Sequence, residues 1–210
     1  MKFTNITYRN TEELYFSYYL DELIEQNIVE SYEYEPESFE LTPEVTFNYI
    51  KTTVLKTKTK IEDKTKALLH KHCYTPDFKI MTLNKGHELN LFNIFLDSFP
   101  IFICSQKKSN GENDLDFPCW VDIKGQFAGK TNSTQYTFPL NQKWMYDKYS
   151  IYVQKIKPFD LFKATFTPKK VIEEMVYKRD YIKKGKLLAK QGDNRLGYEP
   201  ITLETWMKKL

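Results

Sequence analysis

Two aspartates and a lysine have the types and the spacing that hydrolysis of a phosphodiester requires. Asp77 lies in "YTPDF" and Asp122 in "CWVDIKG", two short runs in which most neighbours are apolar. An unpaired carboxylate is costly in apolar surroundings, so each of these side chains needs a cation or a hydrogen-bond donor. Lys124 follows Asp122 by two residues, and on a strand the two side chains project from the same face. The spacing therefore predicts one site that holds both carboxylates and an ammonium group.

Such a site suits a hard cation. Mg²⁺ is bound by one or two carboxylates, keeps several waters and contacts a substrate phosphate. We expect Asp77, Asp122 and the backbone carbonyl of Ile123 to be its ligands, with Mn²⁺ able to substitute. Lys124 would position the attacking water and offset the negative charge that grows on the phosphate.

A further carboxylate is expected from the first helix. Asn10 or Thr11 is a natural N-cap for the run "NTEELYFSYYLDELIEQNIV". Glu12 and Glu13 flank the apolar stripe of this helix about equally, each roughly 50° from its centre, so periodicity does not choose between them. Glu13 also stands where a capping box would use it, with its carboxylate bonded back to the N-cap residue. Catalytic and capping roles both remain open on spacing alone.

The surrounding elements alternate between helices and strands. Apolar periodicity predicts helices over residues 10–29 and 140–149. Strands are expected over residues 30–43, 46–61, 73–83, 119–125 and 150–156, with a further strand over 100–104. Loops are expected at 105–118 and 126–139, a short helix at 87–99, and a loop or short helix at 62–73. This order predicts an α/β (α+β) fold with a mixed sheet.

The motifs resemble those of PD-(D/E)XK nucleases, and their surroundings resemble the phage branch related to Holliday-junction resolvases. That branch has a Glu-bearing helix, an "F-E-x-x-P" strand, "Y-x-x-D-F" and an apolar "[ED]-x-K-G". This chain reads "EELYFSYYLDEL", "YEYEPESFEL", "YTPDF" and "WVDIKG" in the same order, and the resemblance covers about Glu12 to Pro158. It implies a restriction-endonuclease-like core, a mixed central sheet flanked by helices. It also implies a phage-encoded, Mg²⁺-dependent endodeoxyribonuclease acting at branched DNA or at other recombination or replication intermediates.

The resemblance also assigns roles to residues. The helix-to-strand spacing of the family falls on Glu13, which would be a further metal ligand and catalytic carboxylate. Members often carry a helix after the lysine strand with a polar residue facing the site, and Gln142 or Lys143 is the candidate here. A surface helix anchored by Trp144 explains the same residues equally well. Related resolvases work as dimers, which implies a homodimer.

The interval between the two motifs departs from the compact phage relatives, in which the motif strands are close in sequence. About forty residues separate Phe78 from Asp122. We therefore expect a nuclease core over residues 1–158 with an insertion at about 81–118, followed by a basic C-terminal extension over 159–210. Asp114 and Asp116 are alternatives to Asp122, although neither has a lysine two residues later.

The charges of the chain are unevenly spread. Residues 1–50 hold two Lys or Arg and eleven Asp or Glu, whereas residues 51–210 carry an excess of basic residues that brings the whole chain to +3. The basic part could contact DNA phosphates without sequence preference. The candidate contacts are Lys56, Lys58, Lys60, Gln142, Lys143, Lys169 and Lys170, the first three expected on one strand face.

Composition narrows the class of protein. Three cysteines without paired spacing, and no apolar run of membrane-spanning length, indicate a protein of a reducing compartment, the host cytoplasm if a phage encodes it. The run "HKHC" lacks the second ligand cluster that a zinc site needs. Two alternatives remain: a nuclease-fold DNA-binding, packaging or virion protein without catalysis, and an interaction domain of unrelated fold. In the second alternative Asp77 and Asp122 would lie beyond the reach of one metal ion.

Overall fold

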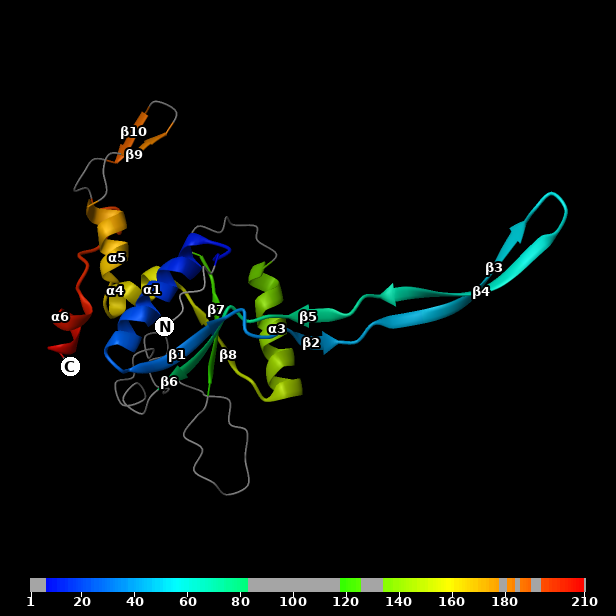
Figure 1. Cartoon of the computed structure of the whole chain (residues 1–210), viewed down its shortest axis with the longest axis horizontal. Coiled ribbons are helices and arrows are strands. Elements are labelled where there is room, and N and C mark those ends of the chain that lie inside the picture. Colours follow the sequence, from blue (N-terminus) through cyan, green and yellow to red (C-terminus); the bar gives the residue numbers. More distant parts are fainter. Residues whose placement is uncertain are drawn as a thin grey trace, which may run out of the picture.

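The computed structural model describes residues 7–82, 118–125, 134–177, 181–183, 186–189 and 194–209. The centre is a four-stranded sheet in the order β1-β6-β7-β8 (Figure 1). Its strands are β1 Val29–Tyr34, β6 Phe78–Thr82, β7 Cys119–Ile123 and β8 Val153–Ile156. β1, β6 and β7 pair antiparallel, whereas β7 and β8 are parallel. The mixed α/β class predicted from the sequence is confirmed.

Helix α1, Thr11–Glu25, packs on this sheet through an apolar side. The side-chain oxygen of Asn10 caps it by accepting a hydrogen bond from the backbone N–H of Glu13 at 2.8 Å. Phe16 is fully buried and meets Phe78 of β6 edge to face, with ring centroids 5.1 Å apart. The predicted helix over 10–29 is thus confirmed for most of its length, and its last expected residue, Val29, begins β1 instead.

The sheet separates two apolar layers. Val121 and Ile123 of β7 pack with α1, whereas Trp120 packs in a second cluster with Phe138 and Met145. The last two belong to helix α3, Thr134–Tyr149. Because alternate residues of a strand face opposite sides, Asp122 projects on the same side of β7 as Trp120, toward α3. Both faces of β7 are therefore covered, and the whole strand is buried.

A long two-stranded arm replaces two of the expected elements. β3 Val45–Val54 and β4 Thr59–Leu69 form an antiparallel hairpin, which extends away from the body (Figure 1). The single strand predicted over 46–61 and the loop or helix predicted over 62–73 are therefore wrong. The turn at residues 55–58 contains no Gly, Pro, Asn or Asp, so it lacks the usual signal. It is closed by a 2.8 Å hydrogen bond from the Leu55 N–H to the Lys58 carbonyl.

A short strand pair joins this arm to the body. β2 Phe39–Thr42 pairs antiparallel with β5 His72–Tyr74. The strand expected over 73–83 is thus two strands, β5 and β6, because Thr75 to Asp77 leave the first pair before joining the second. The region 30–43 likewise holds two strands, and β1 forms an edge of the sheet as expected.

Helix α3 is longer than its sequence suggests. Pro139 favours a loop up to that residue, but the helix already begins at Thr134 and contains the proline. Pro139 is the sixth residue of this helix, beyond the first N–H groups that lack a partner, so it removes one backbone hydrogen bond from the helix. β8 confirms the strand predicted over 150–156. The predictions for residues 87–99, 100–104 and 105–118 lie outside the described residues, as does nearly all of the expected insertion at 81–118.

The chain after residue 158 adds to the same core as α1. Its elements are α4 Pro158–Ala164, α5 Lys169–Ile172, a π-helix Glu173–Tyr177, the hairpin β9 Tyr181–Lys183 with β10 Lys186–Ala189, and α6 Leu203–Met207. Phe162, Phe166 and Leu203 are buried in the apolar cluster that α1 forms with the sheet. Tyr19 of α1 stacks on Phe166 with ring centroids 4.3 Å apart. The C-terminal residues therefore help to fix α1.

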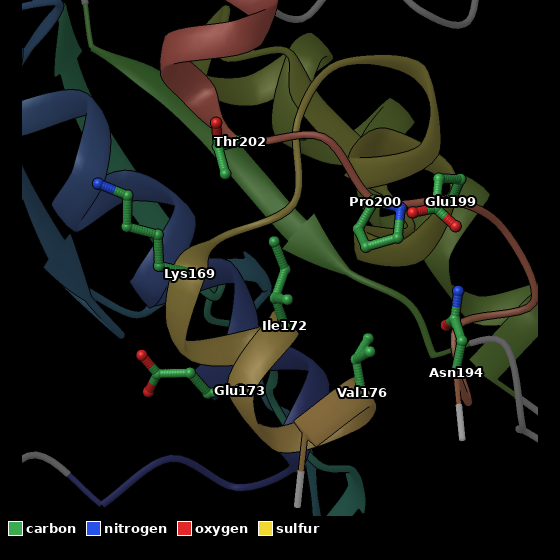
Figure 2. Close-up of a pocket in the computed structure, with 8 residues that line it drawn as sticks. All are labelled: Lys169, Ile172, Glu173, Val176, Asn194, Glu199, Pro200 and Thr202. Carbon is green, nitrogen blue, oxygen red and sulfur yellow. The ribbon is translucent and has the colours of Figure 1, made fainter. Parts of the chain in front are cut away.

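A cavity of about 510 Å³ lies beside α5, where the last segment of the chain passes over the helix (Figure 2). It is lined by Lys169, Ile172, Glu173, Val176, Asn194, Glu199, Pro200 and Thr202. None of the residues of the PD-(D/E)XK-like motifs lines it. Among the described residues, no helix is both long and apolar enough to cross a membrane.

Candidate active site

The fold brings Asp77 and Asp122 together. Phe78, which follows Asp77, pairs with Val121, which precedes Asp122. One carboxylate oxygen of Asp77, Oδ2, accepts a hydrogen bond from the backbone N–H of Ile123 at 2.6 Å. Only 9% of Asp77 and 3% of Asp122 are exposed. The strand pairing β6–β7 thus places two buried carboxylates side by side, as the motif spacing requires.

The buried pair raises the proton affinity of Asp77. Burial raises the pKa of Asp77 to about 7, and the charges of Asp122 and Glu13 add to this rise. The Ile123 N–H and the Lys124 ammonium oppose it. Near neutral pH, Asp77 is therefore poised between a neutral and a charged form, and a bound cation would favour the charged form.

Asp122 is held by two partners. Its Oδ2 accepts a 2.6 Å hydrogen bond from the Tyr74 hydroxyl, and its Oδ1 forms an ion pair with Lys124. Burial, followed by the charge of Asp122, raises the pKa of Tyr74, so this phenol remains a donor at physiological pH. The Lys124 ammonium also lies over the ring of Phe138, 5.3 Å from its centroid. Within the described residues, Oδ1 accepts no well-aligned hydrogen bond, which leaves a buried oxygen with ligand capacity.

These residues line a cleft of about 350 Å³. β5, the Asp77 segment, β7 and α3 all contribute to its walls. Its lining residues are Arg9, Cys73, Tyr74, Thr75, Asp77, Asp122, Lys124, Thr137, Phe138 and Asn141. The cleft therefore joins the two motifs to the helix that follows them.

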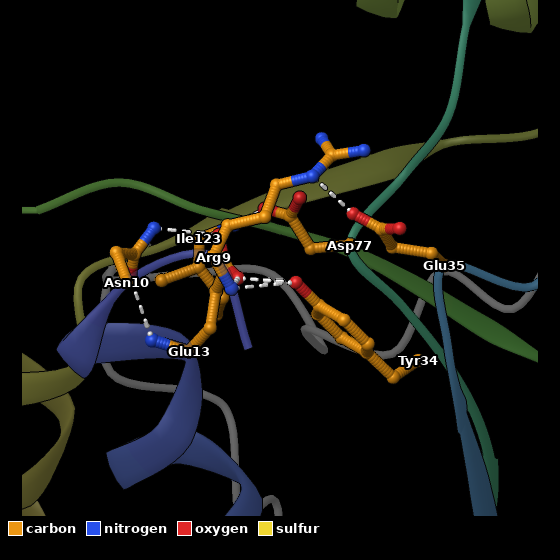
Figure 3. Close-up of polar contacts among 7 residues, drawn as sticks. All are labelled: Arg9, Asn10, Glu13, Tyr34, Glu35, Asp77 and Ile123. Atoms are coloured by element: carbon orange, nitrogen blue, oxygen red, sulfur yellow. Dashed lines mark hydrogen bonds and ion pairs between the residues drawn. The ribbon is translucent and has the colours of Figure 1, made fainter. Parts of the chain in front are cut away.

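Glu13 lies behind Asp77 and is almost fully bonded (Figure 3). Its carboxylate accepts hydrogen bonds from the Asn10 side-chain amide at 2.6 Å, the Arg9 N–H at 3.0 Å and the Tyr34 hydroxyl at 2.5 Å. With the Asn10 cap, these bonds close the start of α1 in the manner of a capping box. Glu13 is also near enough to Asp77 to raise its pKa. The capping arrangement is present, and it holds a carboxylate beside the site.

Glu12 lies beside the end of the lysine strand. A Cβ atom built on Gly125 would lie 2.9 Å from Glu12 Oε1, so the carboxylate rests against the glycine that follows Lys124. Glu12 is partly exposed, whereas Glu13 is 3% exposed. The first turn of α1 thus presents one carboxylate near Asp77 and another near the lysine strand, and the choice between them stays a prediction.

On α3, a neighbour of the expected residues enters the cleft. Asn141 lines it, and its side-chain oxygen accepts a 2.8 Å hydrogen bond from His72 Nε2 of β5. Gln142 instead donates to the Val153 carbonyl at 2.7 Å, which ties α3 to β8, and Lys143 is exposed. The sequence could not show which of these adjacent polar residues faces the cleft. The helix begins at residue 134, earlier than predicted, so the orientation of its faces was not known from the sequence. Tyr74 was also without a predicted role, although its tyrosine belongs to the "Y-x-x-D-F" motif.

The predicted basic contacts lie apart from the cleft. Lys56 and Lys58 occupy the turn of the arm and only Lys60 lies on a strand, so the expected single strand face is wrong. Lys169 donates to Glu204 at 3.0 Å, and the Lys170 ammonium lies 4.6 Å from the ring centroid of Tyr18. The last two lysines are exposed but already have partners within the chain.

The donors of the cleft fit a hard cation held by few protein ligands. Across the described ranges, no group of three or more His, Cys, Asp or Glu side chains is arranged to hold a metal. The cleft has the two carboxylates of Asp77 and Asp122, and the predicted Ile123 carbonyl would add a third oxygen. Mg²⁺ suits such a set because it retains several waters.

Comparison of the chain with protein-family models, with curated proteins and with solved structures found no match. The case for a function therefore depends on the geometry of the cleft and on the motifs that build it.

Proposed function

We propose that this protein is a Mg²⁺-dependent endodeoxyribonuclease of the PD-(D/E)XK type. The observation that carries the proposal is the meeting of Asp77, Asp122 and Lys124 in one cleft, on a strand pair. Three residues from two distant motifs come together there with the chemistry that the motifs predict. The sheet with α1 on one face and α3 on the other supports a restriction-endonuclease-like core.

The ligands of the cation would be Asp77, Asp122 and the carbonyl of Ile123, for Mg²⁺ or Mn²⁺. When bound, the cation supplies Lewis-acid polarisation of the phosphate and lowers the pKa of water. Asp77 would have to release its proton to hold the cation, because a pKa of about 7 leaves its carboxyl partly protonated near neutrality. The Tyr74 hydroxyl holds Asp122 through Oδ2 and leaves Oδ1, which pairs with Lys124, to bind the cation.

Lys124 has the role of positioning the nucleophile. In the absence of other charges its ammonium neutralises Asp122. A cation on Asp122 would release Lys124 to hold the attacking water and to offset charge on the phosphate. A helix carboxylate, Glu13 or Glu12, would add a further ligand or accept a proton from water. Asn141, which lines the cleft and is held by His72, would donate its side-chain N–H to a phosphate oxygen.

The substrate expected from the resemblance is branched DNA or another recombination or replication intermediate. A phage origin, a host-cytoplasmic location and a homodimer belong to the same proposal. The basic charge outside the first fifty residues supports a polyanionic partner.

The test is a cleavage panel of four-way junction, flap, single strand and plain duplex, with Mg²⁺ or with EDTA. We expect Mg²⁺-dependent cleavage that Asp77→Asn and Lys124→Ala each reduce by about a hundredfold or more. Lys163→Ala is the matched control, because this lysine is exposed on α4 and distant in sequence from both motifs. Full activity of either site variant would refute the assignment.

The ion pair between Lys124 and Asp122 supports a second candidate. Because this pair balances charge without a metal, the cleft could be stable in a protein that only binds DNA, such as a packaging or virion component. Metal-dependent thermal stabilisation separates the two. A nuclease would gain stability with Mn²⁺ and lose that gain in Asp122→Asn, whereas a protein that only binds DNA would show neither effect.

A further inference from the structure

The β3–β4 arm is highly exposed and does not contribute to the core of the body. Its strands have ten and eleven residues, and almost every residue of both is exposed. An isolated two-stranded ribbon is marginally stable in water, because neither face packs against a core. Both faces of this ribbon are open, so the arm has surface available for a partner (Figure 1).

The register gives the two faces different chemistry. Tyr49 pairs with Lys64 and Phe47 with Lys66, and directly paired residues share a face. One face, which we call the lysine face, carries Phe47, Tyr49, Lys51, Thr53, Lys60, Glu62, Lys64 and Lys66. The opposite face carries Thr46, Asn48, Ile50, Thr52, Val54, Thr59, Ile61, Asp63, Thr65 and Ala67. Basic residues of the paired strands are thus confined to one face.

The arm is also basic as a whole. Residues 45–69 contain six lysines and two acidic residues, whereas residues 1–44 contain two basic and eleven acidic residues. Glu62 contacts Lys60 at 2.5 Å and Lys64 at 3.5 Å, so it neutralises part of this charge. No ion pair involves Lys51 or Lys66 among the described residues. An excess of exposed lysines on one face of a ribbon is complementary to a polyanion.

The dimensions of the arm fit duplex DNA. Ten strand residues extend about 33 Å, since each rises 3.2–3.4 Å. One turn of duplex rises about 34 Å, and its major groove admits a two-stranded ribbon. Lysines two residues apart on one strand lie about 7 Å apart, which lets neighbouring side chains reach successive phosphates.

The root of the arm leads into the cleft. β3 continues from β2 and β4 leads to β5, and these short strands pair with each other. Tyr74 at the end of β5 bonds Asp122. A duplex held along the arm would therefore extend from the wall of the cleft.

We propose that the lysine face of the β3–β4 arm binds the phosphate backbone of duplex DNA and holds the duplex that flanks the cleft. The inference deepens the proposed nuclease function, on which it rests for the identity of the nucleic acid. The same charge could also attract an anionic membrane, but three of the four lysines lie in one row along β4, and such a narrow row fits a groove of DNA better than a flat membrane surface. The alternative use of the arm is dimerisation, in which the exposed Ile50 and Ile61 of the opposite face would contact a second copy of the chain. The experiment below also tests for such a dimer.

The experiment compares two triple variants of the full chain with equal net charge. The arm variant is Lys51→Gln with Lys64→Gln and Lys66→Gln, and the control is Lys163→Gln with Lys208→Gln and Lys209→Gln, all exposed lysines. Binding to a duplex of about 40 base pairs, long enough to span both the arm and the cleft, is followed by fluorescence anisotropy in EDTA over a series of salt concentrations. The slope of log K against log salt should fall by about 2.7 in the arm variant, which is about 0.9 for each of three lost phosphate contacts, and affinity should fall about tenfold or more.

The control should keep the wild-type slope, and the triple Lys→Arg variant at the arm positions should restore binding, which excludes misfolding as the cause. Equal slopes in arm and control variants would overturn the inference. Arm-dependent binding to vesicles of anionic lipid, without binding to duplex, would also overturn it. So would a concentration-dependent dimer that the double variant Ile50→Thr with Ile61→Thr abolishes, if the lysine substitutions leave duplex binding unchanged. Because EDTA prevents cleavage, the two proposals can fail separately. Duplex binding that does not depend on the arm, in a protein that cleaves DNA in Mg²⁺, would refute the arm alone. Arm-dependent binding without any cleavage would refute the nuclease alone.

Discussion

Replacing Asp77 with asparagine should change how the stability of the protein depends on pH. Burial raises the pKa of Asp77 from 3.8 to about 7 in the native state, whereas the unfolded chain keeps the ordinary value. Between these two values the native state binds more protons than the unfolded state. The free energy of unfolding of the wild type must therefore fall as pH rises through this window. The amide of the Asp77→Asn variant cannot titrate, but its oxygen can still accept from the Ile123 N–H.

The size of the effect follows from the two pKa values. Between pH 5 and pH 8, a carboxyl whose pKa rises from 3.8 to about 7 on folding removes about 2–3 kcal/mol from the free energy of unfolding. This loss is absent in Asp77→Asn, so the difference in stability between wild type and variant should change by that amount across the window. The protonated wild type and the variant should be similar at pH 5, and the variant should be the more stable at pH 8.

The assay is urea unfolding of both proteins in EDTA at several pH values from 5 to 8. A difference that stays constant across this range would refute the reasoning, because it would mean that Asp77 is not buried beside a second negative charge. Adding Mg²⁺ at pH 8 should then stabilise the wild type by about 2.7 kcal/mol at a concentration about one hundred times the dissociation constant. Asp77→Asn should gain much less, because it lacks one of the two carboxylates.

Four further substitutions test the supports of the cleft. Tyr74→Phe leaves Asp122 Oδ2 without its 2.6 Å donor, so the free energy of unfolding in urea should fall by about 1–3 kcal/mol, and an unchanged value would show that water replaces the hydroxyl. Glu13→Gln should cost about 1–3 kcal/mol because its amide cannot accept from all of the present donors, whereas the partly exposed Glu12→Gln should change stability by less than about 0.5 kcal/mol. Cleavage rates are then measured at a temperature where both variants are folded. The helix carboxylate of the site is the one whose loss lowers the rate, and rates equal to the wild-type rate in both variants would exclude both residues. Phe78→Ala removes a fully buried ring that contacts Phe16 and Tyr34, and calorimetry should record a loss of about 3–5 kcal/mol, while a loss under about 1 kcal/mol would contradict the packing of α1 on β6.

The sequence predicted the elements whose patterns are strong and local. The apolar stripe of α1 and the apolar run of β7 are unambiguous, so the helix, the strand and the mixed α/β class agree with the structure. The hairpin arm was missed because its turn at Leu55 to Lys58 lacks turn residues. Its strands also lack the buried alternation that marks a strand on a core. An exposed ribbon has no apolar period to detect.

The same contrast holds for the site. Asp77, Asp122 and Lys124 were recognisable because a charge in an apolar run demands a partner, and the structure places the three together. The helix carboxylate was not recognisable from the sequence. Glu12 and Glu13 are about 100° apart on the helix and lie equally far from its apolar stripe, and both reach the region of the site. Asn141 and Tyr74 act through contacts that depend on the packing of α3 and β5 against β7, which no local pattern encodes.

The proposed function requires Asp77 and Asp122 to hold a divalent cation together. Anomalous diffraction of Mn²⁺ in crystals of the wild-type protein can locate such a cation. We expect a peak bonded to both carboxylates and to the Ile123 carbonyl, with Lys124 moved away from Asp122. A cleft without a peak at saturating Mn²⁺, with the Lys124–Asp122 ion pair intact, would contradict it.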